Sequence, residues 1–294
     1  MNQTLIVYGN CQAQNVAEVL KRNPLLAMQY RVLYLSSVTG LLSNEVSEAD
    51  VAACGILLEQ MNDIPFAYRD KLAPAAKTLV FRTAMLYFLY PFFSSANPYN
   101  LKRPPASPWG LFPYGDQAII DLIDQGLPAA EILDIYLNHY ERYAVDLEKL
   151  YRLERARQLT VDDRCDVKMA EFLLDNFRTQ RLFFTITHPT PLVFRELLAQ
   201  LVAACAAHDP ALATVDIGAT LSGILQTHPR GPLYTQVTPI HPKVAEHFAL
   251  TWYDPNERFE VHTSLLSYRD YFAAMIAEFQ AVKAAQERGQ VTLG

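Results

Sequence analysis

The sequence lacks an excess of positive charge, and that lack removes one class of function. Its 25 Lys and Arg residues are outnumbered by 31 Asp and Glu residues, which gives a net charge of −6. A nucleic-acid surface needs a basic stripe, and none is visible. We therefore expect no nucleic acid among its partners, whereas a small anionic ligand would need only a few well-placed cations.

Cysteines and long apolar runs are also scarce. Cys11, Cys54, Cys165 and Cys205 lie far apart and form no CxxC pair or Cys/His cluster, so we expect neither disulfides nor a metal site. The most apolar stretch, residues 83–93, is shorter than the roughly twenty residues of a transmembrane helix and is interrupted by proline. The N-terminus has no basic leader. These absences predict a cytoplasmic protein without a transmembrane segment.

What the sequence does contain is an alternation of strand and helix patterns. A three-layer α/β/α fold with a mostly parallel sheet is typical of such alternation. Residues 116–176 are helical in pattern, so we expect a single domain over residues 1–294 with a helical insertion at about 116–180. Strands are expected at residues 5–9, 28–36, 55–61, 77–81 and 181–187, a short helix at 64–72 and a long one at 266–286.

The first strand ends in a turn that carries a cysteine. The apolar run stops at Gly9-Asn10, and a helical pattern begins after Cys11 and Gln12. Such a turn at the carboxyl end of a parallel strand faces the ligand crevice, and the helix N-terminus would push the thiol toward thiolate. A small buried cysteine that fills space beneath the turn is the alternative.

Two His-Pro sequences stand before helical patterns later in the chain. His188 follows the strand at residues 181–187, and Thr190 and Pro191 are typical of a helix start. His241 stands before a second helical pattern. If the strand before His188 lies in the same parallel sheet, this imidazole reaches Cys11, as the base of a nucleophile must. A solvated or capping histidine is the alternative.

Residues 84–114 form a long segment rich in aromatic residues and proline. Lys102 and Arg103, followed by Trp109 and Tyr114, suit a ligand with a phosphate at one end and a flat ring at the other. A hydrophobic lid that packs on the sheet is the alternative. Arg82 ends the fourth strand at the same crevice edge as Cys11.

The N-terminal GNCQ turn, the late THPTP and the further PIHPKVAEHF together resemble the WcbI-type capsular polysaccharide biosynthesis acetyltransferases. The resemblance implies coenzyme A binding and acetyl transfer from acetyl-coenzyme A to a sugar hydroxyl, in association with capsule biosynthesis machinery. It also implies a likeness to SGNH-type esterases. Cys11 stands where those enzymes have Ser, and Thr185 stands three residues before His188 where they have Asp. The resemblance therefore does not carry over a complete catalytic triad.

On this hypothesis, His188 or His241 takes a proton from the acceptor hydroxyl, and backbone N–H groups from Asn10 to Gln12 hold the oxyanion, helped by the Asn10 and Gln12 side chains. Cys11 acts covalently or borders the thioester. An SGNH-like esterase or thioesterase and a non-catalytic nucleotide- or glycan-binding component are the alternatives. The candidate contacts to the coenzyme are Gly9, Arg82, Lys102, Arg103, Trp109, Tyr114 and Lys243.

Overall fold

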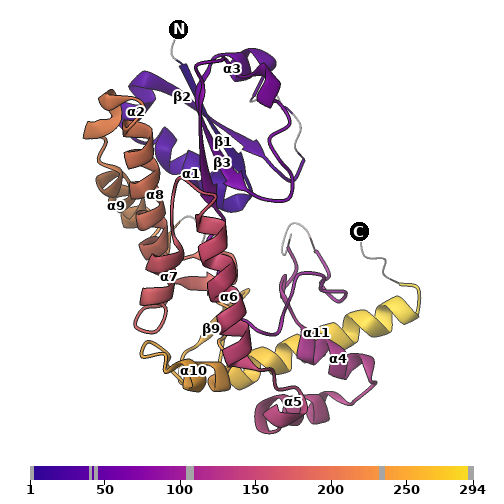
Figure 1. The fold of residues 1–294 in the computed structure, drawn as a ribbon. Coiled ribbons are helices and arrows are strands. Elements are labelled where there is room, and N and C mark those ends of the chain that lie inside the picture. The colour runs from indigo at the N-terminus through magenta and orange to yellow at the C-terminus, as the bar shows by residue number, and fades with distance from the viewer. Residues whose placement is uncertain (1–2, 40–41, 43–45, 104–108, 232–235, 291–294) are drawn as a thin grey trace. The chain divides into compact units, whose positions relative to one another are not determined.

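The protein folds into two compact units (Figure 1). This computed structural model describes residues 3–39, 42, 46–103, 109–231 and 236–290. Unit 1 comprises Met1–Met85 and Arg155–Thr235, and unit 2 comprises Leu86–Glu154 and Gln236–Gly294. The C-terminal segment packs with residues 86–154 in unit 2, and the single domain with a helical insertion stays a prediction.

A four-stranded parallel sheet forms the centre of unit 1, with strand order β2-β1-β3-β4. All six residues from Thr4 to Gly9 are buried, which is typical of a parallel strand covered on both faces. The α/β/α architecture and the first four strands are confirmed. Their bounds are β1 Gln3–Gly9, β2 Tyr30–Ser36, β3 Cys54–Met61 and β4 Lys77–Arg82.

Helices cover this sheet, and α1 packs directly on β1 and β2. On the other face, Phe66, Val46 and Val51 pack with Tyr8 and Leu57 of the sheet. Figure 1 shows α8 and α9 on one side of the strands and α3 on the other. The helices that contribute to unit 1 are α1 Cys11–Lys21, α2 Pro24–Gln29, α3 Glu48–Ala52, the end of α6 Leu147–Asp162, α7 Ala170–Asn176, α8 Pro191–Ala206 and α9 Ile217–Thr227, with the 3-10 helices η1 Arg69–Lys71 and η4 Pro210–Thr214.

Two expectations for unit 1 are wrong. The strand before His188 is only β7 Phe183–Thr185, which pairs antiparallel with β8 His188–Pro189 and lies outside the parallel sheet. The helix expected at residues 64–72 is reduced to η1. The helix α9, whose start is capped by the Asp216 side chain, was not among the expected helices.

Unit 2 is built on aromatic packing around the C-terminal helix α11, Tyr268–Glu287. This helix packs on α4 and α5. Phe92, Tyr99 and Phe112 from the expected aromatic loop are buried in the same cluster, so these parts of the loop belong to the core of unit 2. Residues 104–108 of the loop lie outside the described residues. The remaining elements are η2 Tyr87–Leu89, β5 Phe93–Ser94, β6 Gly115–Asp116, α4 Gln117–Asp124, α5 Ala129–Asn138, η3 Tyr140–Arg142, α10 Pro242–Phe248, β9 Phe259–Val261 and β10 Ser264–Leu266.

Candidate functional site

The turn between β1 and α1 places Cys11 as the first residue of the helix. Asn10 is the N-cap, and its Oδ1 accepts a hydrogen bond from the Gln12 backbone N–H at 2.9 Å. The Asn10 Nδ2 lies 3.5 Å from the Thr83 hydroxyl at the end of β4, the long limit of a hydrogen bond. The cap therefore holds Cys11 at the carboxyl edge of the sheet, where ligands bind in open α/β folds.

Gln12 connects this turn to the His188 turn. Its side chain is fully buried, and its Nε2 donates to the carbonyl oxygens of Ala84 at 2.8 Å and Thr187 at 2.7 Å. Its Oε1 accepts from the Ala84 N–H at 2.9 Å. Both amide hydrogens are thus used inside the protein, so the expected role in holding an oxyanion is wrong. Gln12 instead fixes the residue before His188 beside the first turn of α1.

His188 therefore lies near the Cys11 turn, although its strand is not part of the parallel sheet. Its side chain is half-buried. Burial lowers the pKa of His188 below its ordinary value, because the charged imidazolium loses hydration. The imidazole is consequently neutral at neutral pH and able to accept a proton.

Cys11 is exposed, whereas the other three cysteines are buried. The pKa of its thiol is raised, chiefly by desolvation, and the backbone N–H groups of Gln12 and Cys11 lower it only in part. The expected shift toward thiolate is wrong, since desolvation outweighs the helix N-terminus.

Two of the three expected backbone donors are already used. The Asn10 N–H donates to the Gln60 Oε1 at 2.8 Å, and the Gln12 N–H donates to its cap. The Cys11 N–H is the third of these expected donors, and its role in holding an oxyanion, with the Asn10 Nδ2, stays a prediction.

Comparison with known proteins assigns the chain to a family. The family model described as polysaccharide biosynthesis enzyme WcbI matches residues 4–210. The chain belongs to the WcbI family. It is therefore an enzyme of polysaccharide biosynthesis, and the resemblance seen in its sequence motifs is confirmed. A comparison with curated proteins finds no match.

A solved structure has the same fold over nearly the whole length. It is described as WcbI, a novel polysaccharide biosynthesis enzyme, in a native form without a disulfide bond between coenzyme A and one of its cysteines. The sequence identity is 19%, the TM-score is 0.69, and the match covers 98% of this chain and 94% of that one. At that identity the likeness shows the fold.

His241 does not fit the expected role of a base in this WcbI-family chain. It is the N-cap of α10 and 8% exposed. Its Nδ1 accepts from the Lys243 backbone N–H at 3.1 Å, and its Nε2 lies 3.0 Å from the Tyr143 hydroxyl. Burial lowers its pKa to about 4. Both ring nitrogens are used in unit 2, so His241 is a structural cap there.

Arg82 is also wrong as a phosphate contact. Its side chain is 1% exposed, and its Nη1 is 3.0 Å both from the Asp162 carboxylate and from the Gln158 carbonyl oxygen. The guanidinium thus joins the end of β4 to α6 inside unit 1, where a phosphate has no access.

The other predicted contacts to the coenzyme, apart from Gly9, belong to unit 2. Lys102 is exposed, and Arg103 and Lys243 form ion pairs with Glu278 at 2.6 Å and Glu246 at 2.8 Å. Trp109 is 70% exposed, and the Tyr114 ring packs on Phe93 with centroids 5.6 Å apart. These groups remain predictions.

Sequence reasoning missed Gln60 and Tyr34 as neighbours of the turn, whereas it expected Thr83, after the fourth strand, at the same edge as Cys11. Tyr34 donates to the Gly9 carbonyl oxygen at 3.0 Å from β2. Gln60 is 1% exposed and contacts Asn10 from β3. A signal for Gln60 was present, because a polar residue near the end of an otherwise apolar strand is buried only when it has a local role.

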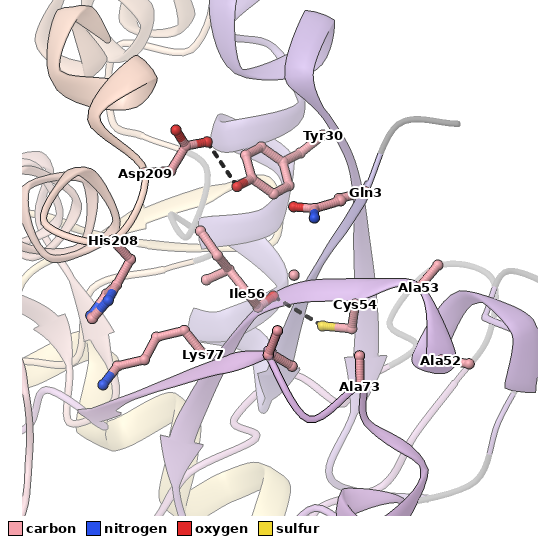
Figure 2. A pocket seen from close by; sticks show the side chains of 13 residues that line it. Gln3, Tyr30, Ala52, Ala53, Cys54, Ile56, Ala73, Lys77, His208 and Asp209 are labelled. Carbon is pink, nitrogen blue, oxygen red and sulfur yellow. Dashed lines mark hydrogen bonds between the residues drawn. The ribbon is translucent and has the colours of Figure 1, made fainter.

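A cavity of 720 Å³ opens at the opposite edge of the same sheet (Figure 2). It is lined by the residues that begin the four strands, including Tyr30 and Lys77, and by His208 after α8. Figure 2 shows Tyr30 hydrogen-bonded to Asp209 across it, at 2.9 Å. The length of β1, about 20 Å at 3.3 Å per residue, separates this cavity from Cys11. It is therefore distinct from the candidate site.

No helix among the described residues has both the length and the apolar character needed to cross a membrane. Within the same residues, no group of three or more His, Cys, Asp or Glu side chains is arranged to hold a metal ion.

Proposed function

We propose that this enzyme transfers an acetyl group from acetyl-coenzyme A to a sugar hydroxyl during the synthesis of a capsular or surface polysaccharide. The acceptor is a sugar or polysaccharide precursor in the cytoplasm, met in association with the capsule biosynthesis machinery. Membership of the WcbI family and the coenzyme named with the solved WcbI structure support this proposal.

One observation carries the proposal. An exposed thiol begins α1, and a neutral histidine lies on the turn that Gln12 fixes beside it. A thiol and a proton acceptor at the carboxyl edge of a parallel sheet are the groups that acyl transfer requires. Water could act as acceptor in the same place, so hydrolysis is an outcome that the experiments must separate.

The proton and the acyl group move as follows. His188 removes the proton from the sugar hydroxyl, and the hydroxyl oxygen attacks the thioester carbonyl carbon. The negative charge that develops on the carbonyl oxygen is held by the Cys11 N–H and the Asn10 Nδ2. The carbon–sulfur bond then breaks, and the coenzyme A thiolate takes the proton from His188. In a covalent route, His188 takes the Cys11 proton, the sulfur attacks the thioester, and coenzyme A leaves as the thiol with that proton. The sugar hydroxyl, deprotonated by His188, then attacks the acetyl-Cys11 thioester, and the Cys11 thiol is regenerated.

The raised pKa of Cys11 favours direct attack by the sugar, because a protonated thiol is a poor nucleophile. In this route Cys11 borders the thioester and shapes the site. Lys102, Arg103 and Lys243 are the groups we propose for the phosphates, with Trp109 or Tyr114 near the adenine, since guanidinium and ammonium groups bind phosphates and aromatic rings stack on bases.

Calorimetry with coenzyme A on the wild type and on Cys11→Ala tests the proposal. We expect binding to the wild type and retained binding to Cys11→Ala, with Cys54→Ala as a control in which a buried thiol is removed. Absence of binding to the wild type would contradict the proposal.

A turnover assay separates transfer from hydrolysis. Acetyl-coenzyme A should be consumed only when a sugar acceptor is present. Steady consumption without acceptor would show a thioesterase, and coenzyme binding without consumption in either condition would show a binding component.

A further inference from the structure

Gln60 lies directly beneath the Cys11 turn. It is the second-last residue of β3, and β3 pairs with β1 in the centre of the sheet. A Cβ atom on Gly9 would lie 2.4 Å from the Gln60 Oε1 and 2.6 Å from the Ala13 Cβ. Gly9 also has a φ of +155°. Glycine at this position therefore makes the room into which the Gln60 amide fits.

The Gln60 amide is oriented by one hydrogen bond. Its Oε1 accepts the Asn10 N–H at 2.8 Å, which fixes which end of the amide is the oxygen, since two N–H groups cannot face each other. Its Nε2 is buried and has no partner among the described residues. A buried donor without an acceptor destabilises a fold, so core packing alone does not explain a glutamine here.

The carbonyl group of the same peptide is held from the opposite side. The Gly9 oxygen accepts from the Ser37 N–H at 2.9 Å and from the Tyr34 hydroxyl at 3.0 Å. The peptide that joins Gly9 to Asn10 is therefore fixed at its N–H by β3 and at its C=O by β2 and the residue after it. The orientation of this peptide decides where the Asn10 cap and the Cys11 N–H point.

We propose that Gln60 is a positioning residue for acyl transfer, which holds the Gly9–Asn10 peptide so that the Cys11 thiol and N–H face the ligand. The catalytic consequence rests on the proposed function, whereas the positioning of the turn does not. The backbone N–H groups of Gln12 and Cys11 that reach the thiol depend on the same turn, so loosening it removes contacts that favour the thiolate.

Three variants test the proposal. Gln60→Met keeps the side-chain length and removes the acceptor, and Gln60→Glu keeps an oxygen acceptor at the same position. Leu58→Met is the matched control, because Leu58 is fully buried on the same strand two residues earlier, on the same face, and has no contact to Asn10 through a polar atom. Circular dichroism checks that each variant is folded.

The first measurement is hydrogen exchange of the Asn10 amide. We expect protection in the wild type, Gln60→Glu and Leu58→Met, and exchange about tenfold faster in Gln60→Met, the factor that one lost hydrogen bond represents. The second is the pH dependence of Cys11 alkylation by iodoacetamide, which reports Cys11 because the other cysteines are buried. Its midpoint should move to higher pH in Gln60→Met and stay in place in Leu58→Met.

Equal Asn10 exchange and equal alkylation midpoints in Gln60→Met and Leu58→Met would overturn the proposal. Gln60→Glu replaces this test if Gln60→Met does not fold. The proposal is then overturned if folded Gln60→Glu, which keeps the oxygen acceptor, loses the protection of the Asn10 amide from exchange. Both measurements are made without coenzyme A or acceptor, so failure of the positioning role is distinguishable from failure of the transferase proposal. Where turnover is present, kcat should fall about tenfold in Gln60→Met while KM for the acceptor changes little.

Discussion

Two His-Pro turns look alike in the sequence and have opposite settings in the structure. His188-Pro189 and His241-Pro242 each stand immediately before a helix, α8 and α10. In unit 2, His241 is enclosed by Tyr136, Tyr140 and Tyr143 with ring centroids 5.0 to 6.0 Å away. Its Nδ1 accepts the Lys243 N–H and so caps α10, and its Nε2 contacts the Tyr143 hydroxyl. In unit 1, His188 is half-buried beside the exposed Cys11 turn.

The difference teaches that two turns with the same local sequence pattern are set apart by what packs around them. The aromatic surroundings of His241 supply partners for both nitrogens and exclude water. At the other turn, the Gln12 amide donates to the carbonyl oxygens of Ala84 and Thr187, and so fixes the residue before His188 beside the first turn of α1. The predictions below test this contrast.

The largest expected difference is in activity. His188→Gln should lower acetyl transfer by about 10²- to 10⁴-fold, because a positioned base is removed. His241→Asn should leave transfer near the wild-type rate, since asparagine replaces the cap acceptor. Steady-state kinetics with a sugar acceptor measures both. An equal loss in the two variants would break the comparison.

Arg82 in unit 1 is comparable to His241 in unit 2, because its side chain is buried and its guanidinium is hydrogen-bonded within the protein. Arg82→Met should lower the free energy of unfolding by about 3 to 5 kcal/mol, because Asp162 then remains buried without its cation. Arg82→Met with Asp162→Asn should recover part of that loss. Urea unfolding measures both variants. A loss of coenzyme affinity in Arg82→Met with unchanged stability would instead restore Arg82 as a phosphate contact.

His241 should make stability depend on pH. Its pKa is about 4 in the folded protein against an ordinary 6.5, so the unfolded chain binds the proton more readily. Stability should be complete above pH 6.5 and fall by roughly 3 kcal/mol as the pH drops to about 4.

His241→Asn should remove most of this dependence, as urea unfolding at several pH values will show. A smaller slope should remain, because the pKa of His188 is lowered as well. An unchanged slope in His241→Asn would mean that the ring is hydrated and that the two turns are less different than their contacts indicate.

Trp109 should give the smallest effect. Its side chain is 70% exposed, so Trp109→Ala should change the free energy of unfolding by less than about 0.5 kcal/mol. If the ring stacks on the adenine, coenzyme A should bind about tenfold more weakly. Calorimetry on Trp109→Ala and on Tyr87→Ala, a control at another exposed aromatic residue of unit 2, distinguishes stacking from a general loss of surface.

The sequence predicted the parallel sheet because buried parallel strands are continuous apolar runs, and the runs ending at Gly9, Ser36, Met61 and Arg82 stand out against polar connections. It did not predict that the strand before His188 lies outside this sheet, because the local sequence pattern of the three residues of β7 does not indicate which strand they pair with. It also did not predict α9, since Asp216 as a cap becomes visible only when the following residues are known to pack.

The sequence predicted that Cys11, His188 and the end of the fourth strand lie at one edge of the sheet, and their joint role as a site stays a prediction. Glycine, asparagine and cysteine after an apolar run mark a strand-to-helix turn by their local preferences alone. Gln60, Tyr34 and Thr83 come from three other strand ends, and each contacts the turn only once the strands are side by side. Arg82 is the converse case, because a cation at a strand end has the same local pattern whether it meets a ligand or Asp162.

By itself, the sequence determined the first four strands, the turn that carries Cys11 and the family to which the chain belongs, since these depend on local pattern and on motifs. Only the tertiary structure decided which polar atoms are already used. Hydrogen-bond partners such as Gln60 for Asn10, Thr187 for Gln12 and Tyr143 for His241 are 50, 175 and 98 residues apart in the chain. Contacts over such separations arise from packing, which no local sequence pattern encodes.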